Sequence, residues 1–194
     1  MNQTFGITMK VISVLKSGGG FNQEDVRKLK SMCERFVDCE FYCLTDVKID
    51  GVNTVPLEHN WKGWWSKMEL FRPDLFDEQV LYLDLDTVIV GDFSHFYDFT
   101  AFAMLNDQLH KQYYGSGVMM FNPRRNSGIY EEFKKNMQNR SDYYNSSDQY
   151  RLQKPTVGGQ TVATETDLSL LFFERVTQLA GDQSYITQIM PGNF

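Results

Sequence analysis

The chain has 194 residues, 42% of them hydrophobic and 14% aromatic, so it is long enough for one globular domain with a sizeable core. Its 19 lysines and arginines against 25 aspartates and glutamates give a net charge of −6 without a long block of like charge, which excludes a broad nucleic-acid-binding surface. No run of about 18 apolar residues predicts a membrane span, and the polar start Met1–Thr8 lacks the pattern of a secretory signal, so we expect a cytoplasmic protein.

The first predicted element is a buried strand over Met9–Leu15, which is short and rich in β-branched residues. Ser17 and the three glycines after it end that strand in a loop. Asn22 is suited to cap a helix that runs to about Phe36, because its side chain can accept a hydrogen bond from the first turn. One face of this helix would carry the apolar residues Val26, Leu29, Met32, Cys33 and Phe36.

Two further strands are predicted over Glu40–Leu44 and Val52–Leu57. Ser66–Phe71 is predicted to be helical and to end at Arg72, because the residue before a proline resists the helical region. Strands that are linked by helical crossovers indicate an α/β fold.

The most apolar strand is predicted over Gln79–Leu83, which runs directly into Asp84, Leu85 and Asp86. The later part of the chain adds strand candidates at Thr87–Val90, Ala101–Leu105 and Val118–Phe121. Two helices are predicted there, over Ile129–Gln138 and Asp167–Leu179. The polar segment between them, Arg140–Thr166, is predicted to be a long loop.

The three cysteines, Cys33, Cys39 and Cys43, are odd in number and lack paired CxxC spacing. We therefore expect reduced, partly buried thiols rather than a disulfide framework or a zinc site. The three tryptophans could stack on a sugar or a base, but core packing is the commoner fate of tryptophan, and we expect it for Trp61, Trp64 and Trp65.

Asp84 and Asp86 form a DxD motif at the end of the most apolar strand. In an extended segment alternate side chains share a face, so both carboxylates would point the same way while Leu85 points into the sheet. Two convergent carboxylates suit Mg²⁺ or Mn²⁺, which could bridge diphosphate oxygens and neutralise the charge of a leaving diphosphate. The alternative is that both aspartates begin a solvated turn, since DxD alone is a common pattern.

The segment YLDLDTVIVGD at residues 82–92 resembles the strand–DxD–strand element of GT-A glycosyltransferases, especially the glycogenin-like family 8 group. Further segments resemble that family in the same order: VLKSGGGF at 14–21, SKMELF at 66–71, YGSGVMMFN at 114–122 and GDQSYI at 181–186. The resemblance spans nearly the whole chain. It implies one domain over residues 1–194, folded as a three-layer α/β/α sandwich of the GT-A type with a Rossmann-like nucleotide-binding half.

The same resemblance implies an enzyme that transfers a hexose from a nucleotide-diphosphate sugar, most simply a UDP-sugar, to a hydroxyl acceptor with retention of configuration. It assigns Asp84 and Asp86, with Leu85 between them, to a Mn²⁺ or Mg²⁺ ion and to the ribose or diphosphate of the donor. It places Lys67 near the donor phosphates or sugar, where a point charge would assist the leaving diphosphate. Without the resemblance, Lys67 is read as a solvent-facing helical lysine.

The resemblance also places the first strand and its loop beside the nucleobase and ribose, at Val14, Leu15, Lys16, Ser17 and Gly18. The small residues Gly115, Ser116 and Gly117 resemble the step where the donor sugar lies close to the backbone, although a tight turn is the alternative. Asp182 and Gln183 resemble the pair that lines the sugar pocket, and with Lys67 they are the predicted catalytic residues. Asp182 could instead cap the turn that follows it.

The sequence departs from the family at its end. Family members usually continue past the DQ pair to a histidine that completes the metal site and a nearby lysine, whereas this chain ends at Phe194. We therefore expect a truncated chain, in which two carboxylates and water hold the metal and binding depends more on the nucleotide.

Two other functions stay open. Haloacid-dehalogenase-like phosphatases carry a similar DxDx(T/V) pattern, which would make Asp84 the nucleophile and Asp86 the acid/base group. Against this class, Ile186 stands where its GDxxxD element requires an aspartate. The other alternative is a protein that binds a nucleotide-sugar without turnover.

Overall fold

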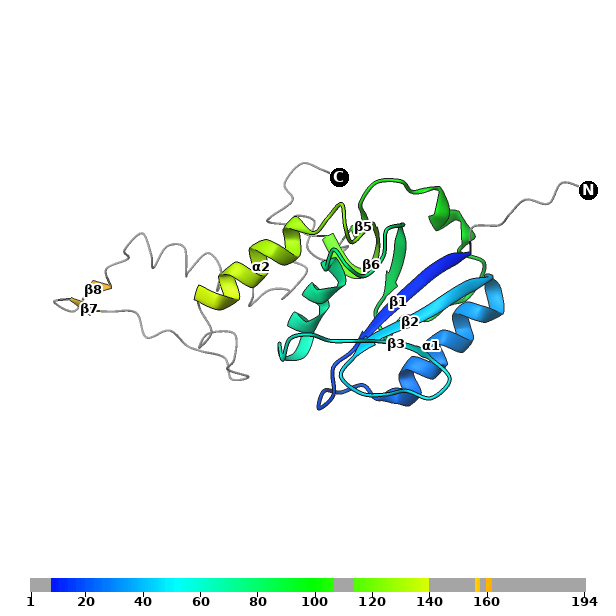
Figure 1. Cartoon of the computed structure of the whole chain (residues 1–194), viewed down its shortest axis with the longest axis horizontal. Helices are drawn as coiled ribbons and strands as arrows, with labels where there is room; N and C mark the ends of the chain where they lie inside the picture. Colours follow the sequence, from blue (N-terminus) through cyan, green and yellow to red (C-terminus); the bar gives the residue numbers. More distant parts are fainter. Residues whose placement is uncertain (1–7, 107–113, 140–155, 158–159, 162–194) are drawn as a thin grey trace, which may run out of the picture.

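The structure, a computed structural model, describes residues 8–106, 114–139, 156–157 and 160–161 of the chain. Its centre is a six-stranded sheet with the strand order β3-β2-β1-β4-β6-β5 (Figure 1). The strands are β1 (Met9–Leu15), β2 (Cys39–Thr45), β3 (Asn53–Pro56), β4 (Val80–Leu83), β5 (Ala103–Asn106) and β6 (Tyr114–Phe121).

The strand directions create one edge where several chain segments meet. Strand β1 pairs in parallel with β2 and β4, and β2 with β3, whereas β6 runs antiparallel to both β4 and β5. The carboxyl ends of β1, β2 and β4 therefore lie at the same edge, where ligands of open α/β sheets usually bind. There the backbone N–H of Asp84 donates to the carbonyl of Gly117 at 2.9 Å, next to the paired residues Leu83 and Val118.

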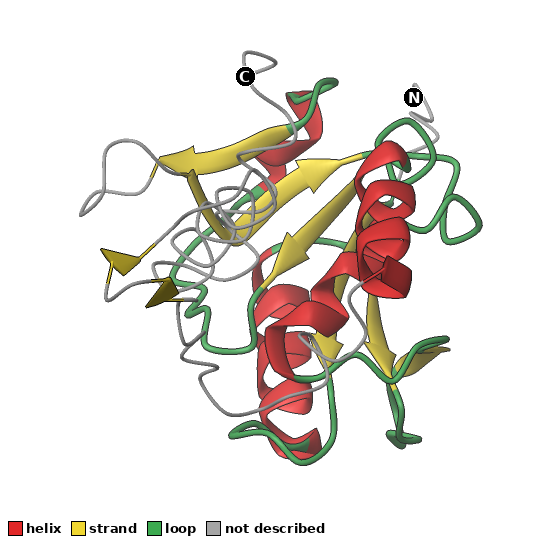
Figure 2. Ribbon diagram, turned by 90° about the vertical axis from the view of Figure 1, so that its left-hand side faces the viewer, coloured by secondary structure: helices red, strands yellow, loops and turns green. Residues whose placement is uncertain are grey.

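Helices cover both faces of the sheet, α1 on one face and η1 with α2 on the other (Figures 1 and 2). They are α1 (Gln23–Phe36), the 3₁₀ helices η1 (Gly63–Phe71) and η2 (Ser94–Asp98), and α2 (Gly128–Asn139). The Asn22 side chain accepts a hydrogen bond from the backbone of Glu24, and the Asp25 side chain accepts one from the backbone of Asn22. This capping box fixes where α1 begins.

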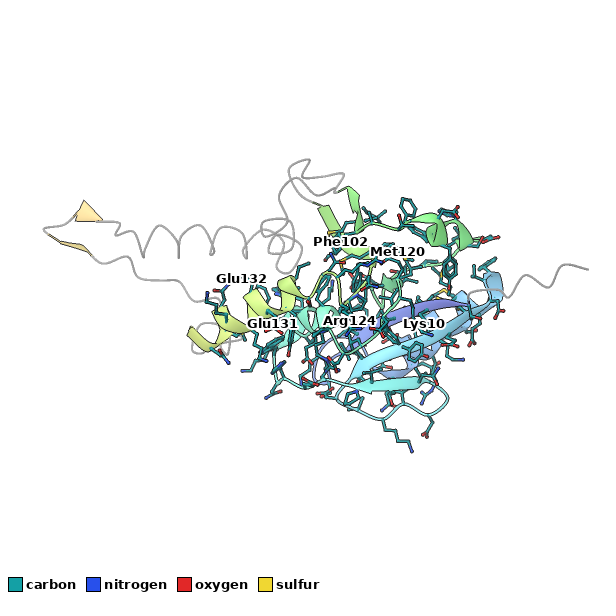
Figure 3. The ribbon with its side chains drawn as sticks, turned by 45° about the horizontal axis from the view of Figure 1, so that its top comes forward. Lys10, Phe102, Met120, Arg124, Glu131 and Glu132 are labelled. Atoms are coloured by element: carbon teal, nitrogen blue, oxygen red, sulfur yellow. The ribbon has the colours of Figure 1, made fainter. Side chains whose placement is uncertain are left out.

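Side chains that alternate along the strands divide the core into two halves. Along β4, Val80 and Tyr82 belong to the half beneath η1 and α2, whereas Leu81 and Leu83 belong to the half beneath α1. The outer face of α2 carries the exposed residues Glu131 and Glu132 (Figure 3), while its buried residues Ile129, Tyr130 and Phe133 pack on the first half. The predicted three-layer α/β/α sandwich is confirmed.

Most predicted elements are confirmed, with β6 beginning at Tyr114 rather than at Val118. The strand predicted over Thr87–Val90 is wrong. The chain turns after β4, because the backbone N–H of Thr87 donates to the carbonyl of Asp84 at 3.0 Å, and Val88 and Val90 are 70% and 87% exposed. β-Branched residues favour a strand where a neighbouring strand packs against them. Within the described part of the chain, no strand pairs with Thr87–Val90.

The long loop predicted over Arg140–Thr166 contains a small unpredicted hairpin, in which β7 (Thr156–Val157) pairs antiparallel with β8 (Gln160–Thr161). The helix predicted over Asp167–Leu179 lies outside the described residues. In the part of the chain that the structure describes, no helix combines the length and the apolar character needed to cross a bilayer.

All three cysteines are free thiols, as predicted. Burial raises the pKa of Cys33 to about 12 and that of Cys43 to about 11, so both behave as inert core residues. Trp61 is buried and Trp65 stacks on Phe133, but Trp64 is 59% exposed, so the core-packing prediction is wrong for Trp64.

Candidate functional site

The candidate site lies at the carboxyl edge of β4, where three elements that are far apart in sequence converge. Helix η1 supplies Lys67, the residue after β4 is Asp84, and β6 supplies Ser116 and Gly117. The Lys67 ammonium lies 3.0 Å from Asp84 Oδ1 and donates to Ser116 Oγ at 3.3 Å. The structure therefore brings together four of the residues that the sequence proposed for the donor site.

Lys67 is a buried lysine with only 8% of its surface exposed. Lysine is almost never buried unless it is paired, and here the Asp84 carboxylate provides the opposite charge. The alternative of a solvent-facing helical lysine is therefore wrong. The pair places one positive and one negative group at the sheet edge, where they are partly shielded from water.

Tyr82 contacts both members of this pair. Its phenol donates a hydrogen bond to Asp84 Oδ1, and the Lys67 ammonium lies 5.2 Å from the centre of its ring. Tyr82 and Asp84 are two residues apart along an extended segment, so they share one face of the sheet. Sequence reasoning missed Tyr82, although this spacing was a usable signal.

Gly117 approaches the other oxygen of the same carboxylate. A Cβ atom added at Gly117 would lie 3.2 Å from Asp84 Oδ2, which is tighter than an ordinary van der Waals contact. The hydrogen bond between the Asp84 N–H and the Gly117 carbonyl fixes the two backbones at this separation. Glycine at this position therefore makes room for the carboxylate, as the small-residue step of the sequence suggested.

Asp86 differs from Asp84 in its surroundings. The chain turns through Leu85 and Asp86, so the extended course predicted for the DxD motif is wrong beyond Asp84. Leu85 is 9% exposed and packs in the core half beneath α1, as predicted, whereas Asp86 is exposed. The motif thus supplies one partly buried carboxylate and one that faces solvent.

The loop after β1 is tied to the end of β2 by Asp46, a residue that sequence reasoning missed. Asp46 accepts hydrogen bonds from the Ser17 hydroxyl at 2.7 Å and the Ser17 backbone N–H at 2.9 Å, and it pairs with the Lys16 ammonium at 2.7 Å. Burial alone would raise the pKa of Asp46, but these bonds to its charged form outweigh burial and lower the pKa from 3.8 to about 2. Gly18 follows with a φ of +84°, a left-handed conformation that favours glycine.

Helix η1 is held in place by a buried ion pair one turn beyond Lys67. Glu69 is fully buried, accepts backbone hydrogen bonds from Glu58 and His59 at 2.7 and 3.0 Å, and pairs with Arg72 at 3.1 Å. Arg72 in turn donates to the carbonyl of Pro56 at the end of β3. These contacts connect η1, the helix that carries Lys67, to the end of β3 and the segment that follows it.

The remaining predicted residues have different outcomes. Leu15 is buried in the α1 half of the core and Val14 is partly buried against the other half. Gly115 has ordinary contacts with Leu105 of β5. Asp182 and Gln183 lie outside the described residues.

Asp84 and Asp86 are the residues at this edge that could hold a hard divalent cation. Asp84 and Asp86 provide carboxylate oxygens, the ligand type that Mg²⁺ and Mn²⁺ prefer. The described residues contain no group of three or more His, Cys, Asp or Glu side chains that could enclose an ion by themselves. An ion held by these two carboxylates would need further ligands, such as diphosphate oxygens and water.

No protein-family model and no curated protein matches this chain by sequence. Its structure resembles the glycosyltransferase GlyE of Streptococcus pneumoniae TIGR4, with a TM-score of 0.60 and 13% identity over 96% of this chain and 44% of that one. It also resembles the galactosyltransferase LgtC, solved in complex with donor and acceptor sugar analogues, with a TM-score of 0.52 and 12% identity. That match covers 69% of this chain and 66% of LgtC.

The chain thus spans less than half the length of GlyE and about two thirds of LgtC. At sequence identities of 12–13%, the structural likeness to these proteins shows a shared fold. The chain has the α/β fold of GT-A glycosyltransferases.

Proposed function

We propose that this chain is all or part of a metal-dependent glycosyltransferase, which transfers a hexose from a UDP-sugar or a similar nucleotide-sugar to a hydroxyl acceptor. The observation that carries the proposal is the convergence of Lys67, Asp84 and Gly117 at the carboxyl edge of a GT-A sheet. In open α/β sheets this edge is the usual place for a nucleotide. The likeness to GlyE and LgtC supports glycosyl transfer as the reaction.

Lys67 would act on the leaving group. Its ammonium is a compact charge at the end of a flexible stem, and it would exchange Asp84 for a diphosphate oxygen when the donor binds. Its hydrogen bond to Ser116 keeps it at the β6 side of the site during that exchange. A positive group held beside the departing diphosphate stabilises the negative charge that develops as the bond to the sugar breaks.

Asp84 and Asp86 would hold a Mn²⁺ or Mg²⁺ ion. When bound, such an ion supplies positive charge to the diphosphate oxygens and so assists departure of the leaving group. Asp86, which is exposed, is the more direct ligand in this proposal, while Asp84 also orients Lys67.

Finer features of the proposal rest on the sequence resemblance to the glycogenin-like family 8 group. These are a UDP donor, retention of configuration, and sugar contacts by Asp182 and Gln183. The loop of Lys16, Ser17 and Gly18, anchored by Asp46, is the proposed border of the nucleobase and ribose. The acceptor is a hydroxyl compound, whether a sugar, a glycan or a protein.

The test is release of UDP from UDP-glucose and UDP-galactose, measured chromatographically with Mn²⁺ and with EDTA. We expect Mn²⁺-dependent release that Asp86→Asn reduces by about two orders of magnitude, as loss of a charge-stabilising group typically does. Asp77→Asn is the matched control, because Asp77 is 75% exposed and pairs with Arg124 on the surface. Equal release by wild type and Asp86→Asn would contradict the proposal.

Neither of the two alternatives predicts release of UDP from the nucleotide-sugar. A phosphatase would hydrolyse p-nitrophenyl phosphate and leave the glycosidic bond of the nucleotide-sugar intact. A binding protein without turnover would retain the intact nucleotide-sugar in a metal-dependent complex and release no UDP.

A further inference from the structure

Tyr82 occupies the point of β4 where the core ends and the candidate site begins. It is 2% exposed, and its ring packs in the core half beneath η1 and α2. Its phenol donates to Asp84 Oδ1. One end of this side chain is therefore fixed by packing, while the other reaches the site.

The hydrogen bond and the ring act on different partners. The phenol restrains the Asp84 carboxylate, whereas the ring face lies 5.2 Å from the Lys67 ammonium. A cation over an aromatic ring is stabilised more strongly where water is excluded, and Lys67 is 8% exposed. Tyr82 thus holds both members of the ion pair without adding a charge of its own.

Gly117 lies on the other side of the Asp84 carboxylate. A Cβ at Gly117 would come within 3.2 Å of Asp84 Oδ2, closer than an ordinary van der Waals contact. Oδ1 meets the Tyr82 phenol and the Lys67 ammonium. The two contacts at Oδ1 restrain the carboxylate before a ligand arrives, while Gly117 leaves space for Oδ2.

We infer that Tyr82 is a positioning residue of the donor site, which fixes Asp84 and through it Lys67 in the arrangement that receives a nucleoside diphosphate. This inference rests on the proposed function for the identity of the ligand. The positioning itself rests on contacts of the protein alone.

The test uses Tyr82→Phe, which keeps the ring and removes only the hydroxyl group. The matched control is Tyr42→Phe, because the Tyr42 phenol donates at 2.7 Å to Glu40, which is also two residues away along a strand. Glu40 lies near the amino end of β2, away from the carboxyl edge that carries Asp84. Equal melting temperatures of the two variants would show that Tyr82→Phe leaves the fold intact.

Two readouts are needed. The first is the ¹⁵N relaxation order parameter of the Lys67 ammonium in the protein without ligands. It should fall in Tyr82→Phe and stay at the wild-type value in Tyr42→Phe. The second is the Kd for UDP in the presence of Mn²⁺, which should rise about tenfold in Tyr82→Phe and by less than twofold in Tyr42→Phe, as loss of a hydrogen bond to a charged group predicts.

The outcomes separate this inference from the proposed function. An unchanged Lys67 order parameter overturns the inference whether or not the protein binds a nucleotide. An unchanged Kd in Tyr82→Phe, with a wild type that binds UDP, also overturns it. If the wild type binds neither UDP nor GDP, the proposed function fails, while a fall in the order parameter would still support positioning of Lys67 by Tyr82.

Discussion

The Asp84 carboxylate is held at its Oδ1 atom, and this limits what a substitution beside its Oδ2 atom can do. Oδ1 accepts a hydrogen bond from Tyr82 and pairs with Lys67, so it has little freedom to move. Oδ2 therefore cannot withdraw easily from an atom placed beside it at Gly117.

Gly117→Ala should weaken binding of a nucleoside diphosphate with Mn²⁺ by about tenfold, because the new methyl group forces Asp84 from its restrained position. Gly128→Ala at the start of α2 is the control, since an added Cβ meets no atom within 4 Å there. Calorimetric titration of both variants with UDP would check this. Equal affinities in the two variants would show that the position of the Asp84 carboxylate does not matter for binding.

Asp46→Asn should destabilise the protein in a way that depends on pH. A pKa lowered from 3.8 to about 2 means that the folded state prefers the charged carboxylate, so its stabilisation is complete above the unfolded pKa and is lost as the pH falls toward 2. The difference in the free energy of unfolding between wild type and Asp46→Asn should be constant above about pH 5 and shrink below about pH 4. Urea unfolding at pH 7, 5 and 3.5 would measure it, and a difference that does not vary with pH would contradict the assignment.

At the scale of elements, η1 presents Lys67 because a buried ion pair anchors the helix. Glu69 receives two backbone N–H groups and the Arg72 guanidinium, and none of its surface is exposed. Removing one member of a buried pair leaves the other charge uncompensated, which is much more costly than losing a surface pair.

Glu69→Ala should therefore lower the free energy of unfolding by about 3–5 kcal/mol. Glu34→Ala is the matched control, because it removes an exposed pair with Lys30 at 2.6 Å on α1 and should cost at most about 0.5 kcal/mol. Both values come from urea unfolding. Similar losses for the two variants would mean that the Glu69–Arg72 pair does not anchor η1.

The elements differ in how far the sequence predicts them. The bounds of α1 follow from Asn22 and the apolar face of the helix, both of which are local signals. Thr87–Val90 misleads because β-branched residues predict a strand, while the structure forms the turn at Asp84 that is only the alternative interpretation of the DxD motif. The burial of Lys67 is likewise unpredictable from its own segment, since it depends on Asp84 and Ser116, which are distant in the chain.

At the scale of the whole molecule, the sequence predicts the α/β class but not the order of the strands. Alternating strands and helices indicate the class. The place of β6 between β4 and β5 depends on the pairing of β6 with β4, two strands that η2 and β5 separate in the chain. Single-sequence patterns carry little information on such pairing. That pairing is what brings Gly117 to Asp84 and so completes the described part of the site.

The central claim is that Asp84 and Asp86 bind a nucleoside diphosphate together with a metal ion. The most direct test is calorimetric titration of the full chain with UDP and with GDP, each with Mn²⁺ and with EDTA, on wild type, Asp84→Asn, Asp86→Asn and the control Asp77→Asn. We predict binding of UDP that needs Mn²⁺, that persists in Asp77→Asn, and that both site variants weaken by at least about tenfold. Metal-dependent binding that survives in Asp84→Asn and Asp86→Asn, or no binding of either nucleotide to the wild type, would contradict the claim.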